Sequence, residues 1–242
     1  MKPINSLTEK DIVNIKVITF DVDGVTVPRG TKIKYKNDVL ELYIKHSPKT
    51  LLNGLRKLSR YFHINISSGR SLLYLMEMYK DLLDVGNLSF TVENGHYTYF
   101  NMTGEIVQHR KVNIFERQLL KKIRFNNEKR VEIEPKEMIL TMHTPVKLMG
   151  LNNYDLPFFY NGEAYDIGKG SKAEGIEYFQ KFHGEVLAIG DNYNDKEMLK
   201  QANISVTADK DRVQGHYFIN DNINLPGYLL IKKLLWLKRR MQ

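Results

Sequence analysis

Short apolar runs alternate with stretches of helical periodicity toward both ends of the chain. Apolar runs at residues 17–20, 63–67, 88–92 and 186–189 have the length and β-branched character of buried strands. Between them, apolar residues at residues 51–62, 71–83 and 173–182 recur at helical spacing. Strands that alternate with helices indicate an α/β protein, so we expect a doubly wound, mostly parallel sheet with a Rossmann-like core.

The middle of the chain has a different pattern. Residues 97–100 and 105–108 flank a turn-forming Asn-Met-Thr-Gly stretch, and residues 158–160 and 164–167 flank Asn-Gly-Glu, so both pairs predict β-hairpins. Residues 114–125 have the spacing of an amphipathic helix. Hairpins between two βα regions predict an inserted α+β domain. We therefore expect a core of residues 1–95 and 167–242 that carries a cap domain of residues 96–166.

The chain closes with predicted strands at residues 204–206 and 217–219 and a helix from about Pro226. This helix is basic and amphipathic, so its apolar side could rest on an anionic membrane or pack against the protein's own sheet. Such a helix more often packs. We expect its leucine and tryptophan side chains to face the sheet.

Composition narrows the class of protein. The chain of 242 residues contains no cysteine, which excludes disulfides, thiolate metal sites and cysteine nucleophiles. The start of the chain lacks the apolar stretch of a secretory signal, and no run of about 18 apolar residues predicts a membrane span. These features fit a cytoplasmic protein without a transmembrane segment.

The formal net charge is +8, with lysine and arginine spread along the chain. An excess of basic residues can favour the binding of a nucleic acid, an anionic membrane or a small acidic substrate. Because most of the charge is dispersed, we interpret it as a solvated basic surface, and we do not expect nucleic-acid binding.

Polar side chains follow several of the predicted strands at the point where each strand ends. Asp21 and Asp23 come at the end of the first, Ser68 and Arg70 after the second, and Asp191 after the strand at residues 186–189. Ligands of an open parallel sheet bind beyond the carboxyl ends of its strands. The sequence therefore predicts that these side chains gather at one edge.

Two carboxylates as close as Asp21 and Asp23 repel each other unless a cation or a proton lies between them. Magnesium suits such a site because it prefers carboxylate and carbonyl oxygens and keeps water ligands that a phosphate can displace. Asp191, Asn194 and Asp195 offer further oxygen atoms, whereas the histidines show no ligand spacing. The expected metal is therefore Mg²⁺ rather than zinc.

This set of groups suits phosphoryl transfer, which depends on positioning and charge neutralisation. A carboxylate can act as the nucleophile and form an aspartyl-phosphate. A lysine ammonium would stabilise the added negative charge. Lys172 stands at the start of a predicted helix and is the candidate, with Lys169 as its competitor.

The order of these motifs resembles that of the haloacid dehalogenase (HAD) superfamily. Asp-Val-Asp-Gly from Asp21 matches its first motif, Ser-Gly-Arg from Ser68 the second, Lys172 the third, and Gly-Asp-Asn-Tyr-Asn-Asp, which contains Asp191, the fourth. The inserted segment and the Glu-Asn-Gly triplet that contains Asn94 resemble subclass IIB, which includes sugar phosphatases. The chain departs from the family in having valine after the first motif, with Thr26 next, and in a short cap without a clear second helix.

The resemblance implies a role for each matching residue. Asp21 would attack phosphorus and ligate Mg²⁺, and Asp23 would protonate the leaving oxygen and then activate water, while its carbonyl contacts the metal. Ser68 and Lys172 would hold the phosphoryl oxygens. Asp191 would be the second metal carboxylate. The remaining candidates are two supporting residues and two substrate-binding residues: Asn194, Asp195, Arg70 and Asn94.

For Arg70 the residues leave two interpretations open, a contact with substrate phosphate or an ion pair with a carboxylate. We expect a Mg²⁺-dependent phosphatase that hydrolyses a small phosphorylated metabolite, a sugar phosphate above all. One alternative is phosphotransfer of the phosphomannomutase type. The other is a catalytically silent protein of this fold that binds RNA or another polyanion, against which the intact set of motif residues argues.

Overall fold

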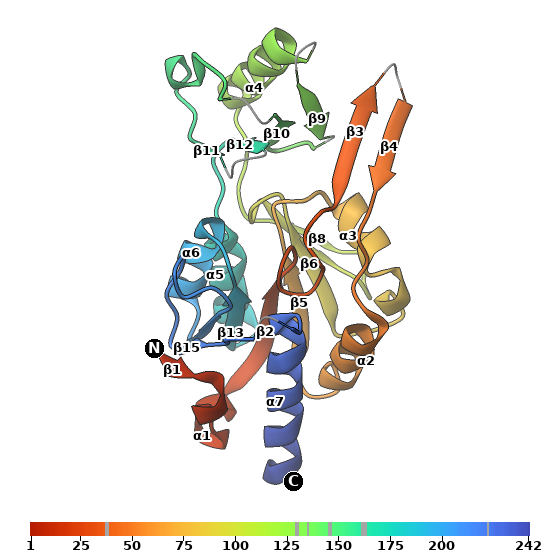
Figure 1. Ribbon diagram of the computed structural model, residues 1–242, viewed down its shortest axis with the longest axis vertical. Helices are drawn as coiled ribbons and strands as arrows, with labels where there is room; N and C mark the ends of the chain where they lie inside the picture. Colours follow the sequence, from red (N-terminus) through yellow and green to blue (C-terminus); the bar gives the residue numbers. More distant parts are fainter. Residues whose placement is uncertain (37–38, 129–130, 135, 145–146, 161–163, 222) are drawn as a thin grey trace.

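The computed structural model describes residues 1–242 except 37–38, 129–130, 135, 145–146, 161–163 and 222. A nine-stranded sheet forms the lower part of the molecule, with strand order β1-β15-β14-β13-β2-β5-β6-β7-β8 (Figure 1). In this spatial order, each strand from β1 as far as β6 is parallel to its neighbour. The strands are β1 (Lys2–Pro3), β2 (Ile15–Asp21), β5 (His63–Ser67), β6 (Leu88–Val92), β7 (Tyr97–Phe100), β8 (Ile106–Gln108), β13 (Glu185–Gly190), β14 (Ile204–Thr207) and β15 (Tyr217–Phe218).

Helices cover both faces of this sheet, because alternate strand residues are apolar on each side. On one face, Ile18 and Phe20 of β2 belong to a core shared with α1 (Glu9–Ile12), α2 (Lys49–Leu58), α3 (Leu72–Met78) and α7 (Pro226–Met241). On the other face, Val17 packs with α5 (Lys172–Phe182) and α6 (Lys196–Gln201). The predicted doubly wound α/β class is confirmed. Helix α3 is shorter than the predicted stretch of residues 71–83, since a 3₁₀ turn, Lys80–Leu82, follows it.

A second, antiparallel sheet lies above the first, in the order β11-β12-β10-β9, with α4 (Ile114–Asn127) packed against it (Figure 1). Its strands are β9 (Glu132–Glu134), β10 (Leu140–His143), β11 (Phe158–Tyr160) and β12 (Ala164–Ile167). The core of this part includes Ile123 of α4 with Met142 and Tyr165 of the sheet. The predicted pairing of β11 with β12 is present, while its turn at residues 161–163 lies outside the described residues.

The cap is as short as the sequence predicted. Between β10 and β11 the described residues contain one short 3₁₀ helix, Leu151–Asn153, and no second α-helix.

The first predicted hairpin forms, but its strands join the large sheet. Strand β7 pairs antiparallel with β6, and β8 pairs with β7. The Thr98 hydroxyl of β7 lies 2.7 Å from the Thr91 hydroxyl of β6, inside the protein. The spacing of residues predicts a hairpin without identifying the sheet it joins. We therefore propose that the inserted domain begins after β8 rather than at residue 96.

A further hairpin stands where the sequence suggested only a polar stretch before the first helix. Strands β3 (Lys32–Lys36) and β4 (Val39–Tyr43) pair antiparallel and rise from the core beside β9 (Figure 1). The hairpin thus brings the chain that follows Asp21 up to the edge of the cap.

Helix α7 packs on the core through Leu230, Ile231, Leu234 and Leu237, as expected for its leucine face. The prediction for tryptophan was wrong, because Trp236 is 47% exposed. Its ring lies under the cations of neighbouring basic side chains, which favours the surface. No helix among the described residues is both long enough and apolar enough to cross a bilayer.

Candidate active site

The candidate site lies where the strand order of the large sheet reverses. Strand β2 leads along the chain to β5 and β6 on one side, while its other neighbour, β13, leads to β14 and β15. Ligands bind at such a switch point, beyond the carboxyl ends of the strands. Asp21 is the last residue of β2, and Asp191 follows β13 directly. Two motif residues that are far apart in sequence are thereby brought to one crevice.

Lys172 is the central cation of the site. Its Nζ donates to Asp21 Oδ1 at 2.5 Å and to Asp195 Oδ1 at 2.6 Å. The residue opens α5, and its side chain is 1% exposed. The second oxygen of Asp195 accepts the backbone N–H groups of Asp191 and Asn192 at 3.0 and 3.1 Å. Asp195 therefore holds both the lysine and the loop that carries Asp191.

Charge is concentrated in a space with little access to water. Burial and the neighbouring Asp195 carboxylate raise the pKa of Asp21 well above its ordinary value, although Lys172 opposes the shift. Burial also raises the pKa of Asp191 to about 6. Burial disfavours the charge on Lys172, but the carboxylates of Asp195 and Asp21 outweigh it and raise the pKa of the lysine. When ionised, these carboxylates thus carry more negative charge than Lys172 alone can neutralise.

The residues present fit a magnesium ion. Asp21, Asp191 and Asp195 each offer a carboxylate oxygen, and these atoms lie within 4.8 Å of one another. Oδ1 of Asp191 is buried and has no hydrogen-bond partner among the described residues, so a ligand-competent oxygen is left open. Oxygen donors alone are what Mg²⁺ prefers. The sequence predicted carboxylate ligands in Asp21 and Asp191 and a carbonyl ligand in Asp23. The cluster adds the carboxylate of Asp195, and the carbonyl of Asp23 stays a prediction.

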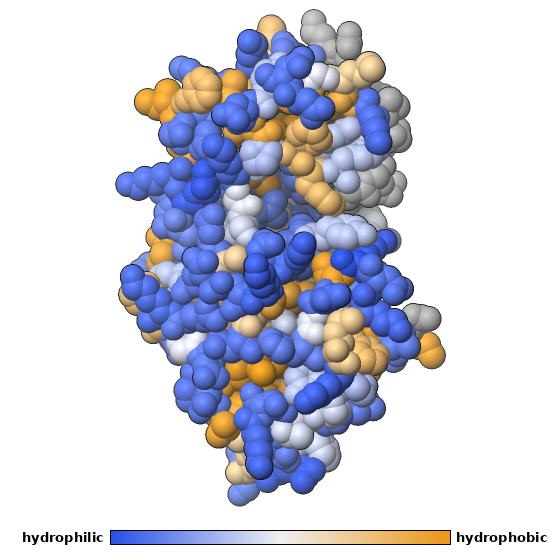
Figure 2. Space-filling model, turned by 90° about the vertical axis from the view of Figure 1, so that its left-hand side faces the viewer, coloured by the Kyte–Doolittle hydropathy of each residue, from blue (hydrophilic) through white to orange (hydrophobic). Residues whose placement is uncertain are grey.

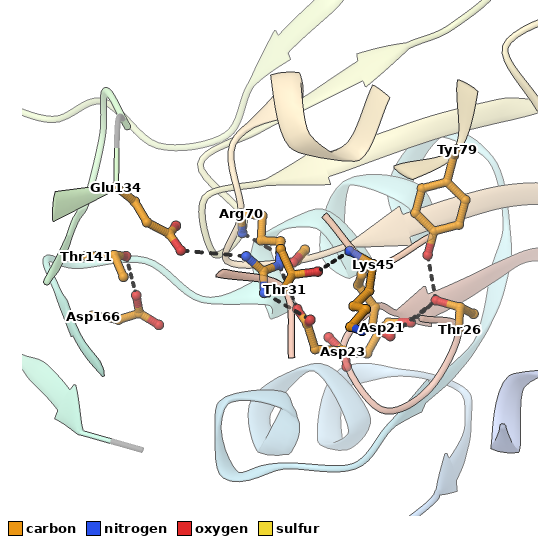
Figure 3. Close-up of polar contacts among 12 residues, drawn as sticks. Asp21, Asp23, Thr26, Thr31, Lys45, Arg70, Tyr79, Glu134, Thr141 and Asp166 are labelled. Carbon is orange, nitrogen blue, oxygen red and sulfur yellow. Dashed lines mark hydrogen bonds and ion pairs between the residues drawn. The ribbon is translucent and has the colours of Figure 1, made fainter. Parts of the chain in front are cut away.

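The Asp23 carboxylate points toward the cap side of the site. Arg70 donates to it through Nε and Nη2, at 2.8 and 2.9 Å (Figure 3). The same guanidinium faces Glu134 of β9 at 3.6 Å. Of the two interpretations of Arg70, the structure has the ion pair with carboxylates.

Arg29 is a residue of the site that the sequence did not single out. Its Nη2 pairs with Asp191 Oδ2, and half of its side chain is exposed. Gly24, with φ of +91°, lets the loop pass so close that an added Cβ would lie 2.5 Å from Asp191 Oδ2. The arginine stands eight positions after Asp21 in an irregular loop, where no periodicity places its side chain.

Thr26 stabilises the loop of the first motif through its hydroxyl group. Its hydroxyl donates to the Asp21 carbonyl at 2.7 Å and lies 2.6 Å from the Tyr79 hydroxyl, and all three residues are buried (Figure 3). The hydroxyl missing at Val25 is thus available one position later, in a structural role.

The second motif is held by a turn after β6. Glu93, Asn94 and Gly95 have positive φ values of 49°, 56° and 87°. The Oδ1 atom of Asn94 is buried without a partner among the described residues and lies against Gly69. Ser68 is 3% exposed, and its Oγ accepts the Arg70 backbone N–H at 3.2 Å. Ser68 follows Ser67, the residue paired with Asp21 in the sheet, so it lies near Asp21.

A cavity of about 270 Å³ opens between the core and the cap, in the hollow that Figure 2 shows between the two parts of the molecule. Lys172 and Asn94 lie at its core side, and Asp166 and Phe158 at its cap side. Asn194, which was predicted to support Asp191, is exposed and lines this cavity. The other lining residues are Ile139, Pro157, Phe159, Ile167, Gly168, Gly170, Ser171, Tyr193 and Glu197.

Lys169, the competitor of Lys172, lies elsewhere. Its side chain is 44% exposed and pairs with Glu116 of α4 at 3.4 Å. The buried position beside Asp21 belongs to Lys172.

Solved structures of similar fold cover nearly all of the chain. A trehalose-6-phosphate phosphatase related protein superposes with a TM-score of 0.68 and 16% identity, covering 94% of this chain and all of its own. The carboxyl-terminal domain of a C. albicans trehalose-6-phosphate phosphatase gives 0.69 and 16%, covering 98% of each chain. The Aspergillus fumigatus enzyme gives 0.62 and 14%, covering 99% of this chain and all of its own. At these identities the likeness is one of fold.

No curated protein sequence matches the chain. A family model described as haloacid dehalogenase-like hydrolase matches residues 164–211, the stretch that contains Lys172, Asp191 and Asp195. Within this stretch the chain is thus similar to the haloacid dehalogenase-like hydrolases, on a fold that carries the motif residues to one crevice.

Proposed function

We propose that the protein is a Mg²⁺-dependent phosphatase that hydrolyses a small phosphate monoester through an aspartyl-phosphate on Asp21. The observation that carries this proposal is the meeting of three buried carboxylates with one buried lysine at the switch point of the sheet. A phosphate that enters this crevice meets a nucleophile, a fixed ammonium and a place for a cation.

In the first step, a carboxylate oxygen of Asp21 forms a bond to phosphorus while the bond from phosphorus to the leaving oxygen breaks. Asp23 gives a proton to that oxygen, so the leaving group departs as a neutral alcohol. In the second step, Asp23 takes a proton from water. The water oxygen bonds to phosphorus, and the bond to Asp21 breaks, which releases inorganic phosphate and restores the carboxylate.

Lys172 supplies fixed positive charge in this scheme. It is the fixed positive charge next to Asp21, so it neutralises part of the charge that builds up on the phosphoryl oxygens. Ser68 borders the same space and can donate a hydrogen bond to one of those oxygens. Mg²⁺, held by Asp21, Asp191 and Asp195, would supply the remaining positive charge and shield the acids from the phosphate.

The cavity sets the size of the leaving group. A space of about 270 Å³ bordered by Asn94, Asp166 and Phe158 suits a compact group with hydroxyls to bond and a face to pack. A sugar phosphate meets these conditions, and the similar structures named trehalose-6-phosphate phosphatase are consistent with that class. The cytoplasmic location expected from the sequence stays a prediction.

The test is a panel of phosphorylated metabolites assayed for inorganic phosphate, with Mg²⁺ and with EDTA. Asp21→Asn is the blank, because an amide cannot form the acyl phosphate but retains the shape of the side chain. Turnover that requires Mg²⁺ and is absent in the blank supports the proposal. If the blank hydrolyses as fast as the parent, the assignment is wrong.

The same panel separates the two alternatives. A phosphotransferase of the phosphomannomutase type would move phosphate between positions of a sugar and release little inorganic phosphate. A silent polyanion-binding protein would bind RNA in a salt-dependent way without turnover.

A further inference from the structure

Helix α4 exposes large apolar side chains on the side that faces away from the cap sheet. Ile114 and Phe125 are each 76% exposed, and Phe115 is 61% exposed. Positions i and i+11 of an α-helix lie along one line, so Ile114 and Phe125 stand on the same stripe about 16 Å apart. A single exposed apolar residue is ordinary on a protein surface. Three of them on the outer face of one 14-residue helix indicate a contact surface.

The same face is strongly basic. Four cations stand between and beside the apolar side chains: Arg117, Lys121, Lys122 and Arg124. All four are exposed, and none of them makes an ion pair with another described residue. Glu116, the only acid within the helix, is buried on the opposite face, and an exposed Glu128 follows at the C-cap. The outer face of α4 therefore presents a net positive charge together with its apolar side chains.

This face lies on the far side of the cap from the candidate active site. Helix α4 packs on the cap sheet through Ile123, which shares a core with Tyr165 of β12. Side chains alternate along a strand, so the next residue, Asp166, projects from the other face of the sheet, where it lines the cavity. In Figure 1, α4 lies at the top of the molecule and the end of α7 at the bottom. A partner bound to the outer face of α4 thus leaves the cavity uncovered.

Charge and apolar exposure together select the partner. A second copy of the chain would bring two faces of like charge together, which is unfavourable. A nucleic acid would pair with the cations, but it offers no apolar counterpart to Ile114. An anionic membrane offers both kinds of contact, lipid phosphates for the cations and acyl chains for the apolar side chains.

We propose that the outer face of α4 docks the cap onto an anionic membrane. The helix lies in the plane of the interface, with Ile114, Phe115 and Phe125 inserted at the boundary of headgroups and acyl chains. At 14 residues α4 is too short to span a bilayer, so it rests on the membrane. The inference goes beyond the proposed function and does not depend on it, because no residue of the candidate active site takes part.

The test is co-sedimentation of the full chain with vesicles of phosphatidylcholine, with and without phosphatidylserine, at physiological ionic strength. Binding should require phosphatidylserine. Phe125→Ser should weaken it about fivefold, because the side chain no longer inserts. The pair Lys121→Gln and Lys122→Gln should weaken it about tenfold or more, because two cations near the lipid phosphates are lost.

Two control variants make the same chemical changes away from α4. Phe182→Ser replaces a phenylalanine that is 61% exposed at the end of α5. The pair Lys200→Gln and Lys210→Gln lowers the net charge by the same amount at exposed positions of the core. Both controls should bind within about twofold of the parent. The urea unfolding midpoint of each variant verifies that it remains folded.

Tryptophan fluorescence identifies the end of the molecule that contacts the membrane. Trp236 is the only tryptophan of the chain and stands on α7 beside Lys233 and Arg240, which form a second basic surface. Phe125→Trp in a Trp236→Phe background should shift its emission to the blue with phosphatidylserine vesicles, whereas the parent should not. A shift in the parent, without one for the tryptophan at position 125, would assign docking to α7 and overturn the proposal.

Binding that falls equally in the two lysine pairs, or that ignores Phe125→Ser, would show only a general attraction of a basic protein to anions and would also overturn it. RNA binding that depends on Lys121 and Lys122, without vesicle binding, would assign the face to nucleic acid instead. Phosphate release from a soluble ester should be unchanged in the α4 variants without vesicles. Failure of docking and failure of the proposed phosphatase are therefore separate results.

Discussion

Lys172 Nζ lies 2.5 Å from Asp21 Oδ1, although the two residues are 151 positions apart in the chain. The contact depends on where α5 begins. Ser171 caps this helix by accepting the Ala173 N–H, so Lys172 is its first residue and lies at the edge of the sheet. The site is thus formed by the meeting of a strand end and a helix start, and its stability and chemistry should respond together.

Replacing Lys172 by methionine should destabilise the metal-free protein by about 3–5 kcal/mol, since it leaves Asp21 and Asp195 buried without their cation. Urea unfolding in EDTA measures this change. Lys169→Met is the control, because that side chain is 44% exposed and should cost at most about 1 kcal/mol. Equal unfolding midpoints for the two variants would mean that the buried pairs contribute nothing.

Magnesium should raise the unfolding temperature of the parent. A ligand that binds only the folded state at a hundred times its dissociation constant adds about 2.7 kcal/mol. In Asp191→Asn, which removes one carboxylate from the cluster, the shift should largely disappear. Asp211→Asn, at an exposed position, should respond like the parent. A shift that survives in Asp191→Asn would place the ion elsewhere.

The free energy of unfolding of the metal-free protein should depend on pH through the titration of Asp191. Its pKa is about 6 in the folded protein, above the ordinary 3.8, because burial disfavours its charge. The folded state then retains a proton that the unfolded state loses, so this group lowers stability as pH rises from about 4 to about 6. The loss amounts to about 3 kcal/mol at most.

Asp191→Asn isolates this effect, since asparagine resembles the protonated acid and does not titrate. In EDTA, the difference in unfolding free energy between variant and parent should move in favour of the variant between pH 4 and pH 7. Saturating Mg²⁺ should remove that trend in the parent, because the ion favours the charged carboxylate. A pH-independent difference in EDTA would contradict the assignment.

The sequence predicted the parts of the site that sit on regular structure. Asp21 ends one strand and Ser68 and Asp191 follow two others, and the apolar character of all three strands is evident from the sequence. The carboxyl ends of parallel strands meet at one edge of the sheet. Arg29 and Glu134 were not predicted, because an irregular loop and a short cap strand give no periodicity that aims a side chain.

The sequence also did not show which of the two sheets the hairpin of residues 97–108 joins. The pattern of residues 97–108 predicts two antiparallel strands with equal force for either sheet. The sheet that the hairpin joins is decided by the pairing of β7 with β6, in which the Thr98 and Thr91 hydroxyls are hydrogen-bonded. Asp195 illustrates the same limit within a motif, since the spacing of that motif does not show that its carboxylate accepts a hydrogen bond from Lys172.

The turn after β6 offers a test of how the core fixes Lys172. Gly95 has φ of +87°, and a Cβ there would lie 2.0 Å from the Ser171 carbonyl oxygen, at the start of α5. Gly104 has φ of +70° with nothing within 4 Å of the same position. Both Gly→Ala changes strain the backbone by about 1 kcal/mol, but only the first forces two backbone segments apart.

Gly95→Ala should therefore destabilise the protein by several kcal/mol more than Gly104→Ala, as measured by urea unfolding. It should also lower the proposed phosphatase activity at temperatures where the variant stays folded, because a shift of Ser171 would move Lys172 away from Asp21. If the two alanine variants matched in stability and activity, the close approach of Gly95 to α5 would not be what positions the lysine.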